Sequence, residues 1–325
     1  MSARLGESEE RENMSGSGNK AWTVDDLRLA GGRRRSDVRM RRVFLAAGFT
    51  TLGITALIVY TLFKDALSFF IDVPKGDLWS IGWFPRRGMF DIKTLVVGTL
   101  MVTGVAMLIA VPLGLGVAVY LSEFAHPRVR RVLKPIVEVL AGIPSVVLGY
   151  FAISFINPNI ILHIAGGANK AFNIAAAGVA VGILTIPIIA SVAEDALRAV
   201  PLALREASYG LGARRVSTTF KVVLPASISG VVAALILGIS RAVGETMVVA
   251  IAAGAVGGGL YSTDVFQPGQ TMTAAMAALG FGSDQVAGNG LAFQSLFFIG
   301  FLLFVMTFFL NLLGDRLVRR VREEY

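Results

Sequence analysis

Residues 206–225 read EASYGLGARRVSTTFKVVLP, a short polar stretch between two long apolar segments. Charged residues up to Glu206 give this region one polar face, which predicts a short amphipathic helix. Gly210 and Gly212 allow a tight turn in which φ is positive. Pro225 is suited to begin the next helix, because its missing N–H costs nothing there. A short helix bounded by such a turn fits a groove on a partner protein.

The composition predicts a membrane protein. Of the 325 residues, 54% are hydrophobic and only 16% are charged, a balance that soluble domains rarely reach. Apolar stretches of about 20 residues recur, and each is long enough to cross a hydrocarbon layer of about 30 Å. Backbone groups in lipid must pair internally, so long apolar runs form helices. We therefore expect an all-α, polytopic membrane helical bundle.

The apolar pattern divides the chain into tails, spans and one long polar loop. We expect about six spans, near 43–63, 93–121, 132–156, 174–193, 226–255 and 291–313. They make up a membrane domain at 43–313 with a polar loop at 194–225. Residues 1–42 are expected to form a mostly disordered tail, because they are polar and rich in Gly, Ser, Glu and Arg. Residues 314–325 form a short C-terminal tail.

The basic residues predict the orientation. With the N-terminus inside, 23 of the 30 Lys and Arg residues lie in inside segments and 6 lie outside. The positive-inside rule therefore places both termini and the 194–225 loop in the cytoplasm. This distribution accounts for the net charge of +8, so we expect a lipid bilayer as partner and no nucleic acid. The external segment 64–92 contains Trp79 and Trp83, and aromatic residues of this kind usually anchor a helix or short hairpin at the membrane surface. For most residues of this segment, however, we favour an inert connector.

No cofactor, metal or thiol chemistry is expected from the sequence. The chain has no cysteine, which excludes disulfides and thiolate catalysis. His126 and His163 are far apart in the sequence and lie near predicted loops, so they do not predict a metal site.

A charged pair lies within the fifth expected span. Arg241 follows Pro225 by about 16 residues, or about 24 Å along a helix, which places it deep in the bilayer. Arg241 and Glu245 are four residues apart, so they share a helical face and can pair. Charges at that depth are costly and usually functional, and a guanidinium suits oxyanions, including phosphate. The alternative is a structural ion pair. Glu138, in the third span, is expected to form a hydrogen bond across helices.

The polar loop resembles a known family. Five residues of the loop match, at the right spacing, the cytoplasmic coupling loop of ATP-binding-cassette (ABC) importer permeases, where the membrane subunit meets its ATPase. These residues are Glu206, Ala207, Gly212, Leu224 and Pro225. Ser208 replaces the second alanine of the family pattern, and Val222 replaces its isoleucine. Both replacements are small or isosteric.

A second motif narrows the resemblance. The sequence Arg-Ala-Val-Gly-Glu-Thr-Met at 241–247 resembles the permeases of bacterial phosphate-specific ABC importers, and Met247 resembles their PstC-type subunit. The resemblance runs from about residue 80 to the C-terminus and does not cover the tail before residue 43. Further matching segments are 83–85, 98–100, 112–116, 120–124 and 140–145.

The resemblance implies a type I ABC importer permease that moves phosphate into the cell. It implies a heterodimer with a PstA-type permease, a cytoplasmic ABC ATPase dimer and an external phosphate-binding protein. Arg241, Glu245 and Thr246 would then lie on the substrate pathway. The chain lacks the Walker A pattern, so we expect no enzymatic activity of its own.

Three alternatives remain open at this stage. The first is an ABC permease for sulfate, molybdate or phosphonate, although such permeases generally lack the 241–247 pattern. The second is an ion-coupled secondary transporter or channel. It predicts inverted repeats or broken helices in matched halves, which the sequence does not show. The third is a membrane scaffold or sensor that acts through its basic tail.

Overall fold

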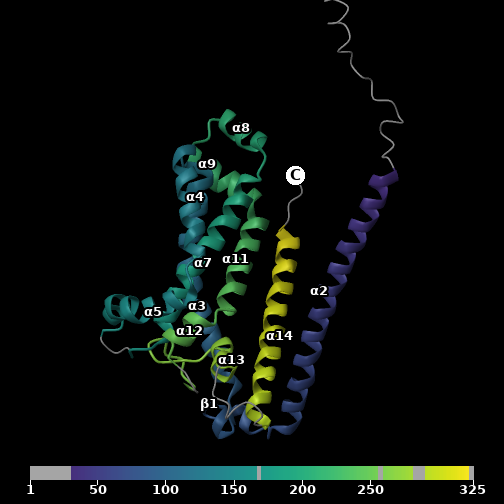
Figure 1. Cartoon of the computed structure of the whole chain (residues 1–325). Helices are drawn as coiled ribbons and strands as arrows, with labels where there is room; N and C mark the ends of the chain where they lie inside the picture. The colour runs from purple at the N-terminus through teal and green to yellow at the C-terminus, as the bar shows by residue number, and fades with distance from the viewer. Residues whose placement is uncertain (1–30, 167–169, 255–258, 281–289, 322–325) are drawn as a thin grey trace, which may run out of the picture. The chain divides into compact units, whose positions relative to one another are not determined.

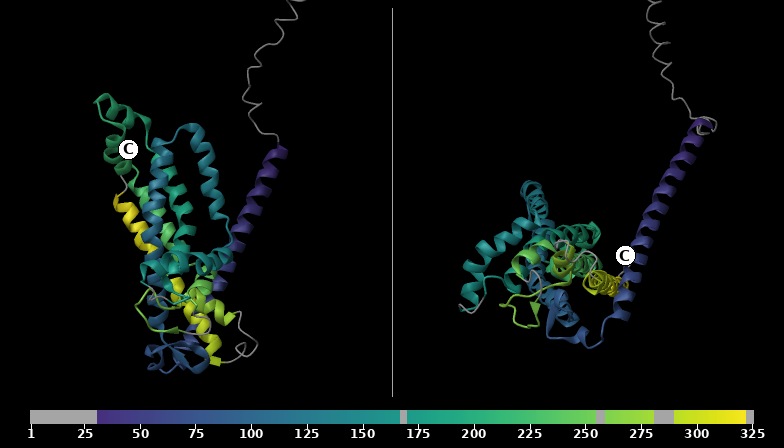
Figure 2. Two further views of the ribbon diagram at one scale, coloured as in Figure 1. Left: turned by 90° about the vertical axis from the view of Figure 1, so that its left-hand side faces the viewer. Right: turned by 60° about the horizontal axis from the view of Figure 1, so that its bottom comes forward.

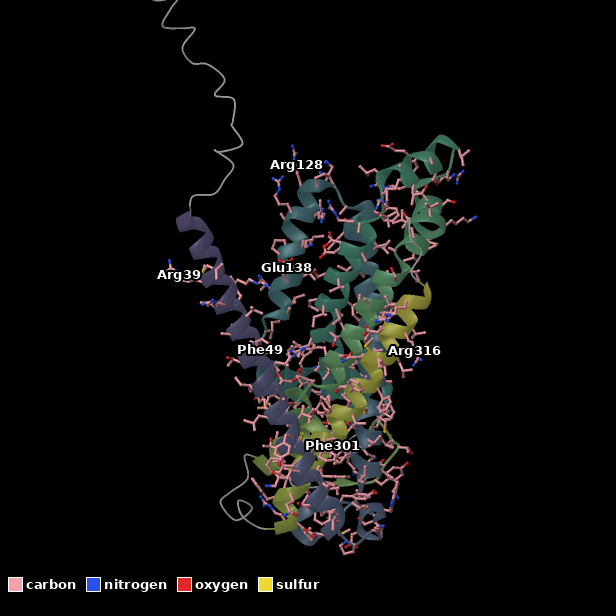
Figure 3. The ribbon with its side chains drawn as sticks, turned by 90° about the vertical axis from the view of Figure 1, so that its right-hand side faces the viewer. Arg39, Phe49, Arg128, Glu138, Phe301 and Arg316 are labelled. Carbon is pink, nitrogen blue, oxygen red and sulfur yellow. The ribbon has the colours of Figure 1, made fainter. Side chains whose placement is uncertain are left out.

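The computed structural model describes residues 31–166, 170–254, 259–280 and 290–321. The chain forms two units, 1–59 and 60–325, which are described separately. The described part of the first unit is the beginning of a long helix, α2 (Gly31–Asp72). This helix includes residues 31–42, which we expected in the tail, whereas the rest of the expected tail lies outside the described residues. Apolar side chains of α2 such as Phe44, Phe49 and Leu52 are exposed, as expected for a lipid-facing helix (Figure 3).

The second unit is built almost entirely from helices (Figure 1). Its long helices are α3 (Ile92–Val119), α4 (Pro127–Ala141), α7 (Ile174–Arg198), α11 (Ile228–Val243) and α14 (Gly290–Val321). Its short helices are α5 (Ser145–Phe151), α6 (Leu162–Ile164), α8 (Leu202–Gly210), α9 (Arg215–Thr218), α10 (Leu224–Ala226), α12 (Met247–Ala252) and α13 (Met272–Gly280). The π-helical turns η3 (Tyr120–Phe124), η4 (Ala152–Ile161) and η5 (Thr219–Val223) link some of them.

A small sheet lies at the end of this unit opposite α8 (Figure 1). The strands are β1 (Gly82–Phe84), β2 (Met89–Phe90) and β3 (Gly259–Leu260), in the antiparallel order β2-β1-β3. The 3-10 turns η1 (Asp77–Trp79) and η2 (Pro85–Arg87) flank β1. Trp83 is buried against Phe90, at a ring-centroid distance of 5.8 Å. Trp83 therefore does not lie at the surface as an anchor would, because its ring is buried in a core that also contains Phe69 of α2, Leu95 of α3 and Met272 of α13. Trp79 is exposed.

The packing of α3 against α7 forms the centre of the unit. The contact uses small residues, which let two helix backbones approach closely in a membrane. A Cβ on Gly178 of α7 would lie 2.6 Å from the Cβ of Val105 on α3, and one on Gly182 would lie 2.9 Å from the Ala106 carbonyl oxygen. Buried alanines of both helices fill the same core. The helix α11 packs against α3 and α7.

The prediction of an all-α polytopic bundle with about six spans is confirmed. Five helical segments are long and apolar enough to cross a membrane, and a bent pair gives a sixth. The five are Val38–Asp72, Ile92–Phe124, Ser145–Ile164, Ile174–Arg198 and Gly290–Arg319; the pair is Arg215–Ala226 with Ile228–Val243, bent by 73°.

Two expected spans are broken by the local sequence. The span expected at 132–156 is interrupted between Ala141 and Ser145, because Pro144 lacks an N–H and disfavours helical geometry in the residue before it. As a result, α4 is a separate amphipathic helix. The span expected at 226–255 bends at Ser227 and breaks again at 244–246. The estimate of 24 Å along a straight helix from Pro225 to Arg241 is therefore wrong.

We predict that Gly178→Ala destabilises the unit. The new methyl group would overlap Val105, and overpacking of this kind typically costs about 1–3 kcal/mol. The expected result is a lower thermal unfolding temperature in detergent. The matched control is Gly104→Ala on α3, where an added Cβ meets nothing within 4 Å. Equal melting temperatures for the two variants would contradict this account of the α3–α7 contact.

Candidate functional site

The loop between α7 and α11 forms a projecting pair of short helices. In Figures 1 and 2, α8 lies at one end of the unit, next to α9. Gly212 adopts a φ of 79°, as the tight turn requires. Gly210 is simply the last residue of α8, and Pro225 is the second residue of α10 rather than its first. Ser208 and Thr218 lie 2.9 Å apart through their hydroxyl groups, which ties α8 to α9.

The outer face of this loop is exposed and partly apolar. Leu211 is 90% exposed, and Leu202 and Tyr209 are exposed as well. Glu206 and Ala207 share this exposure. Apolar side chains that project from a short, well-formed helix are typical of a surface that another protein covers.

An ion pair anchors α8 to the membrane helices. Arg205 donates through Nη1 to both carboxylate oxygens of Glu123, at 2.7 and 2.9 Å, and through Nη2 to the Leu197 carbonyl at 2.8 Å. Glu123 is only 3% exposed and Arg205 only 14%. One guanidinium therefore links α8 to η3, at the end of α3, and to the last turn of α7. Any displacement of α8 is transmitted to both helices or breaks these bonds.

A second buried carboxylate holds α4 against α7. Glu194 accepts a hydrogen bond of 2.7 Å from Nε of Arg130 and lies 3.3 Å from Nζ of Lys134. Lys134 also donates to Asp195 at 3.1 Å. Burial lowers the pKa of Lys134, but the hydrogen bond to Asp195 and the charge of Glu194 together outweigh it, so this pKa is raised. Lys134 therefore stays protonated throughout the physiological pH range.

Sequence reasoning missed the roles of Glu123 and Glu194. Glu123 lies just past the end of the expected second span, and Glu194 begins the expected polar loop. Both positions usually point into solvent, so neither predicted burial. The available signal was an acidic residue at the end of a span, next to a loop rich in arginine. Glu138, which we expected to be buried, is exposed on α4 because that helix is not part of a continuous span (Figure 3).

Arg241 and Glu245 lie at the break between α11 and α12. Arg241 is in the last turn of α11, and its Nη2 lies 3.6 Å from Oε2 of Glu245. Arg241 is 47% exposed, whereas Glu245 is 5% exposed. The two residues therefore pair as expected, but across a helix end rather than along one helical face.

Neighbouring groups hold this break in place. The Thr273 hydroxyl of α13 donates to the Glu245 carbonyl at 2.7 Å, and the Val248 N–H points to the Glu245 carboxylate at 3.5 Å. The Thr246 hydroxyl lies 3.4 Å from the Gly244 carbonyl. An accessible guanidinium with a buried carboxylate behind it can hold an oxyanion weakly, because the carboxylate offsets part of the positive charge.

The chain belongs to the family of binding-protein-dependent transport system inner membrane components, whose model matches residues 110–323. It is therefore a multi-pass plasma-membrane permease of the ABC importer class, whose members work with an ATPase and a binding protein. The resemblance to PstC-type permeases is confirmed by individual relatives. The chain is 30% identical over 265 residues to the phosphate transport system permease protein PstC of Pasteurella multocida, covering 76% of this chain and 80% of the relative.

Other ABC permeases and a solved ABC transporter structure are also similar to this chain. PstC 1 of Mycobacterium tuberculosis is 32% identical over 254 residues, covering 73% of this chain and 75% of the relative. The probable ABC transporter permease protein YqgH of Bacillus subtilis is 31% identical over 251 residues, with coverages of 75% and 78%. A bacterial alginate ABC transporter structure matches with a TM-score of 0.61 at 16% identity, covering 88% of this chain and 97% of that chain. This likeness shows the type I importer permease fold alone.

We predict that Arg205→Ala loosens α8. The substitution leaves the Glu123 carboxylate buried without its cation, at a cost of about 3–5 kcal/mol. Hydrogen–deuterium exchange of α8 and η3 should become faster, while exchange in α14 should not change. Arg214→Ala is the control, because Arg214 is exposed in the same loop and its side chain forms no ion pair in the described structure. Exchange in α8 that is unaffected by Arg205→Ala would show that the ion pair is not an anchor.

Proposed function

We propose that this chain is the PstC-type permease subunit of an ATP-driven importer of inorganic phosphate. The observation that supports an oxyanion pathway is the Arg241–Glu245 pair, which presents an accessible guanidinium at a helix break. The similarity to relatives named as phosphate transport permeases is the reason to propose phosphate in particular. On this proposal, Arg241, Glu245 and Thr246 line the substrate pathway. The cavity that they serve would form between this chain and a PstA-type permease.

The proposed partners follow from the arrangement of the loop. A cytoplasmic ATPase dimer would bind the exposed face of α8, using Glu206, Ala207 and the Gly212 turn, with Leu224 and Pro225 setting the return into the membrane. An external phosphate-binding protein would deliver the substrate. Both termini would be cytoplasmic. The ATPase site would belong to the partner, since this sequence has no Walker A pattern.

The mechanism we infer uses the anchors of α8. Closure of the ATPase dimer on ATP would move α8, and Arg205 would transmit that movement to Glu123 at the end of α3 and to the last turn of α7. Because α3 and α7 form the packed centre, the movement would reach α11, which carries Arg241. The pathway would then open outward, receive phosphate, and return inward after hydrolysis.

A second candidate is an ABC permease for another oxyanion. Sulfate and molybdate also suit a guanidinium, so the Arg241 geometry by itself does not select phosphate. An ion-coupled secondary transporter is disfavoured, because the chain belongs to a family of ABC importer components. The structural role for the Arg241–Glu245 ion pair is compatible with either substrate, since the same pair also holds the helix break.

The test of the substrate is labelled-phosphate uptake at low external phosphate, in cells without a redundant importer. Uptake should require this chain and should resist excess sulfate or molybdate. Arg241→Ala should reduce uptake at least about tenfold, because it removes a charge-assisted hydrogen bond to the anion. Arg241→Lys should be intermediate, since it keeps the charge but loses the planar fork. Competition by sulfate or molybdate would favour the other-oxyanion permease.

The test of coupling uses the loop. Glu206→Lys should abolish uptake and reduce copurification of the ATPase, while membrane insertion stays normal, because the Glu206 side chain is exposed and forms no ion pair or hydrogen bond within the described residues. Gly212→Asp should act similarly, since a side chain at a φ of 79° is strained by about 1–2 kcal/mol. Normal uptake by both variants would rule out this loop as the coupling element.

A further inference from the structure

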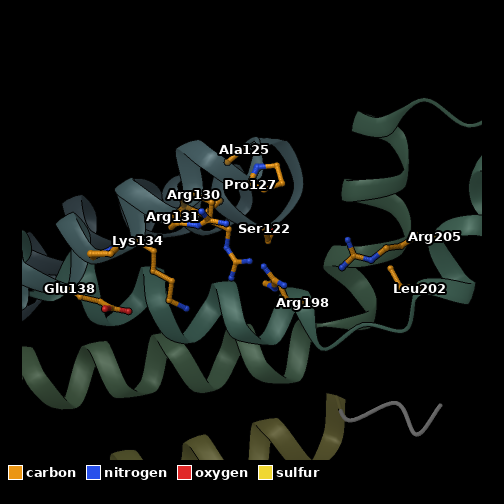
Figure 4. A pocket seen from close by; sticks show the side chains of 12 residues that line it. Ser122, Ala125, Pro127, Arg130, Arg131, Lys134, Glu138, Arg198, Leu202 and Arg205 are labelled. Carbon is orange, nitrogen blue, oxygen red and sulfur yellow. The ribbon is translucent and has the colours of Figure 1, made fainter.

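A basic cavity lies beside the anchors of α8. It has a volume of about 730 Å³ and is bounded by the end of α3 with η3, by α4, by the end of α7 and by α8. Five of its lining residues are basic: Arg130, Arg131, Lys134, Arg198 and Arg205. One, Glu138, is acidic. Figure 4 shows basic side chains of α4 and α7 reaching into this space, with Arg205 approaching from α8.

Two of the five basic groups have no side-chain partner among the described residues. Three of the five are held by carboxylates outside the lining. These carboxylates are Glu123, Glu194 and Asp195. In contrast, Arg131 and Arg198 form no ion pair or side-chain hydrogen bond within the part of the chain that the structure describes, and both are exposed. Glu138 offsets one of these two charges at most, so the cavity keeps an excess of positive charge.

The chemistry of the Arg131 and Arg198 guanidinium groups indicates which class of ligand the cavity would bind. A concave site lined by one sign of charge concentrates counter-ions. Guanidinium groups match the oxygens of phosphate with paired N–H donors. A phosphate group carries about one to two negative charges, and these are attracted by the positive charge of Arg131 and Arg198 that Glu138 leaves unbalanced. We propose that this cavity is a binding site for a phosphate group, held by Arg131 of α4 and Arg198 of α7.

Because the site lies between helices, binding of an anion there would affect how these helices are arranged. The two proposed ligands belong to α4 and α7, so an anion bound between them favours the arrangement described here over any in which these two helices separate. The site lies at the end that the proposed orientation places in the cytoplasm. Two sources share the required chemistry: inorganic phosphate in the cytoplasm and the headgroup of an anionic phospholipid. The proposal goes beyond the transport function, because it holds whichever oxyanion the permease carries.

The test uses the full chain with its copurifying subunits, without the external binding protein, in the Arg241→Gln background. That background removes the proposed pathway site, so failure of the proposed function does not affect the result. One arm titrates inorganic phosphate into phosphatidylcholine nanodiscs by calorimetry. The other arm measures retention of phosphatidylglycerol against phosphatidylcholine by native mass spectrometry. The variant is Arg131→Gln with Arg198→Gln, and the matched control is Arg128→Gln, which removes the same charge from α4 outside the cavity.

We expect the double variant to weaken phosphate-group binding at least about tenfold in one or both arms, and the control to leave it unchanged. Loss only in the calorimetric arm identifies inorganic phosphate as the occupant, and loss only in the lipid arm identifies a headgroup. If the double variant proves unstable, Arg131→Lys with Arg198→Lys keeps both charges and should weaken binding by a smaller factor. Absence of binding in both arms, or equal weakening by Arg128→Gln, overturns the proposal.

Discussion

Close packing of α3 against α7 is the contact on which the rest of the second unit depends. Gly178 and Gly182 bring the two backbones together where any Cβ would collide with Val105 or with the α3 backbone. In a lipid environment the hydrophobic effect contributes little to helix association. Small residues therefore allow close van der Waals contact, which supplies the attraction. The helix α11 packs on this pair. The two candidate sites, at the α11 break and around α8, are both positioned by it.

Two buried acidic groups near α8 each meet a cation from another element. Glu123 of η3 is held by α8, and Glu194 of α7 is held by α4. A buried carboxylate without such a partner would be strongly destabilising, so these pairs restrict how the helices can be placed. They also sit where α8 meets the membrane helices. Anchors of this kind suit an element that must transmit a movement rather than absorb it.

Broken helices provide the remaining functional feature. A break in a membrane helix frees backbone groups that lipid cannot satisfy. Here, side chains form hydrogen bonds with the freed backbone groups. The Thr273 hydroxyl donates to the Glu245 carbonyl, and the Glu245 carboxylate lies near the Val248 N–H. The break turns Arg241 toward an accessible space while Glu245 stays buried. A continuous helix would have given the two residues similar exposure on one face.

The sequence by itself determined the membrane class, the helical fold, the approximate number of spans, the turn at Gly212 and the family. These features follow from local composition, from residue spacing and from the backbone freedom of glycine. Only the tertiary structure decided which cations pair with Glu123 and Glu194, from 82 and 64 residues away, and which arginines of the cavity stay unpaired. It also decided the burial of Trp83. Such contacts depend on how α3, α4, α7 and α8 are brought together, and no local pattern carries that information.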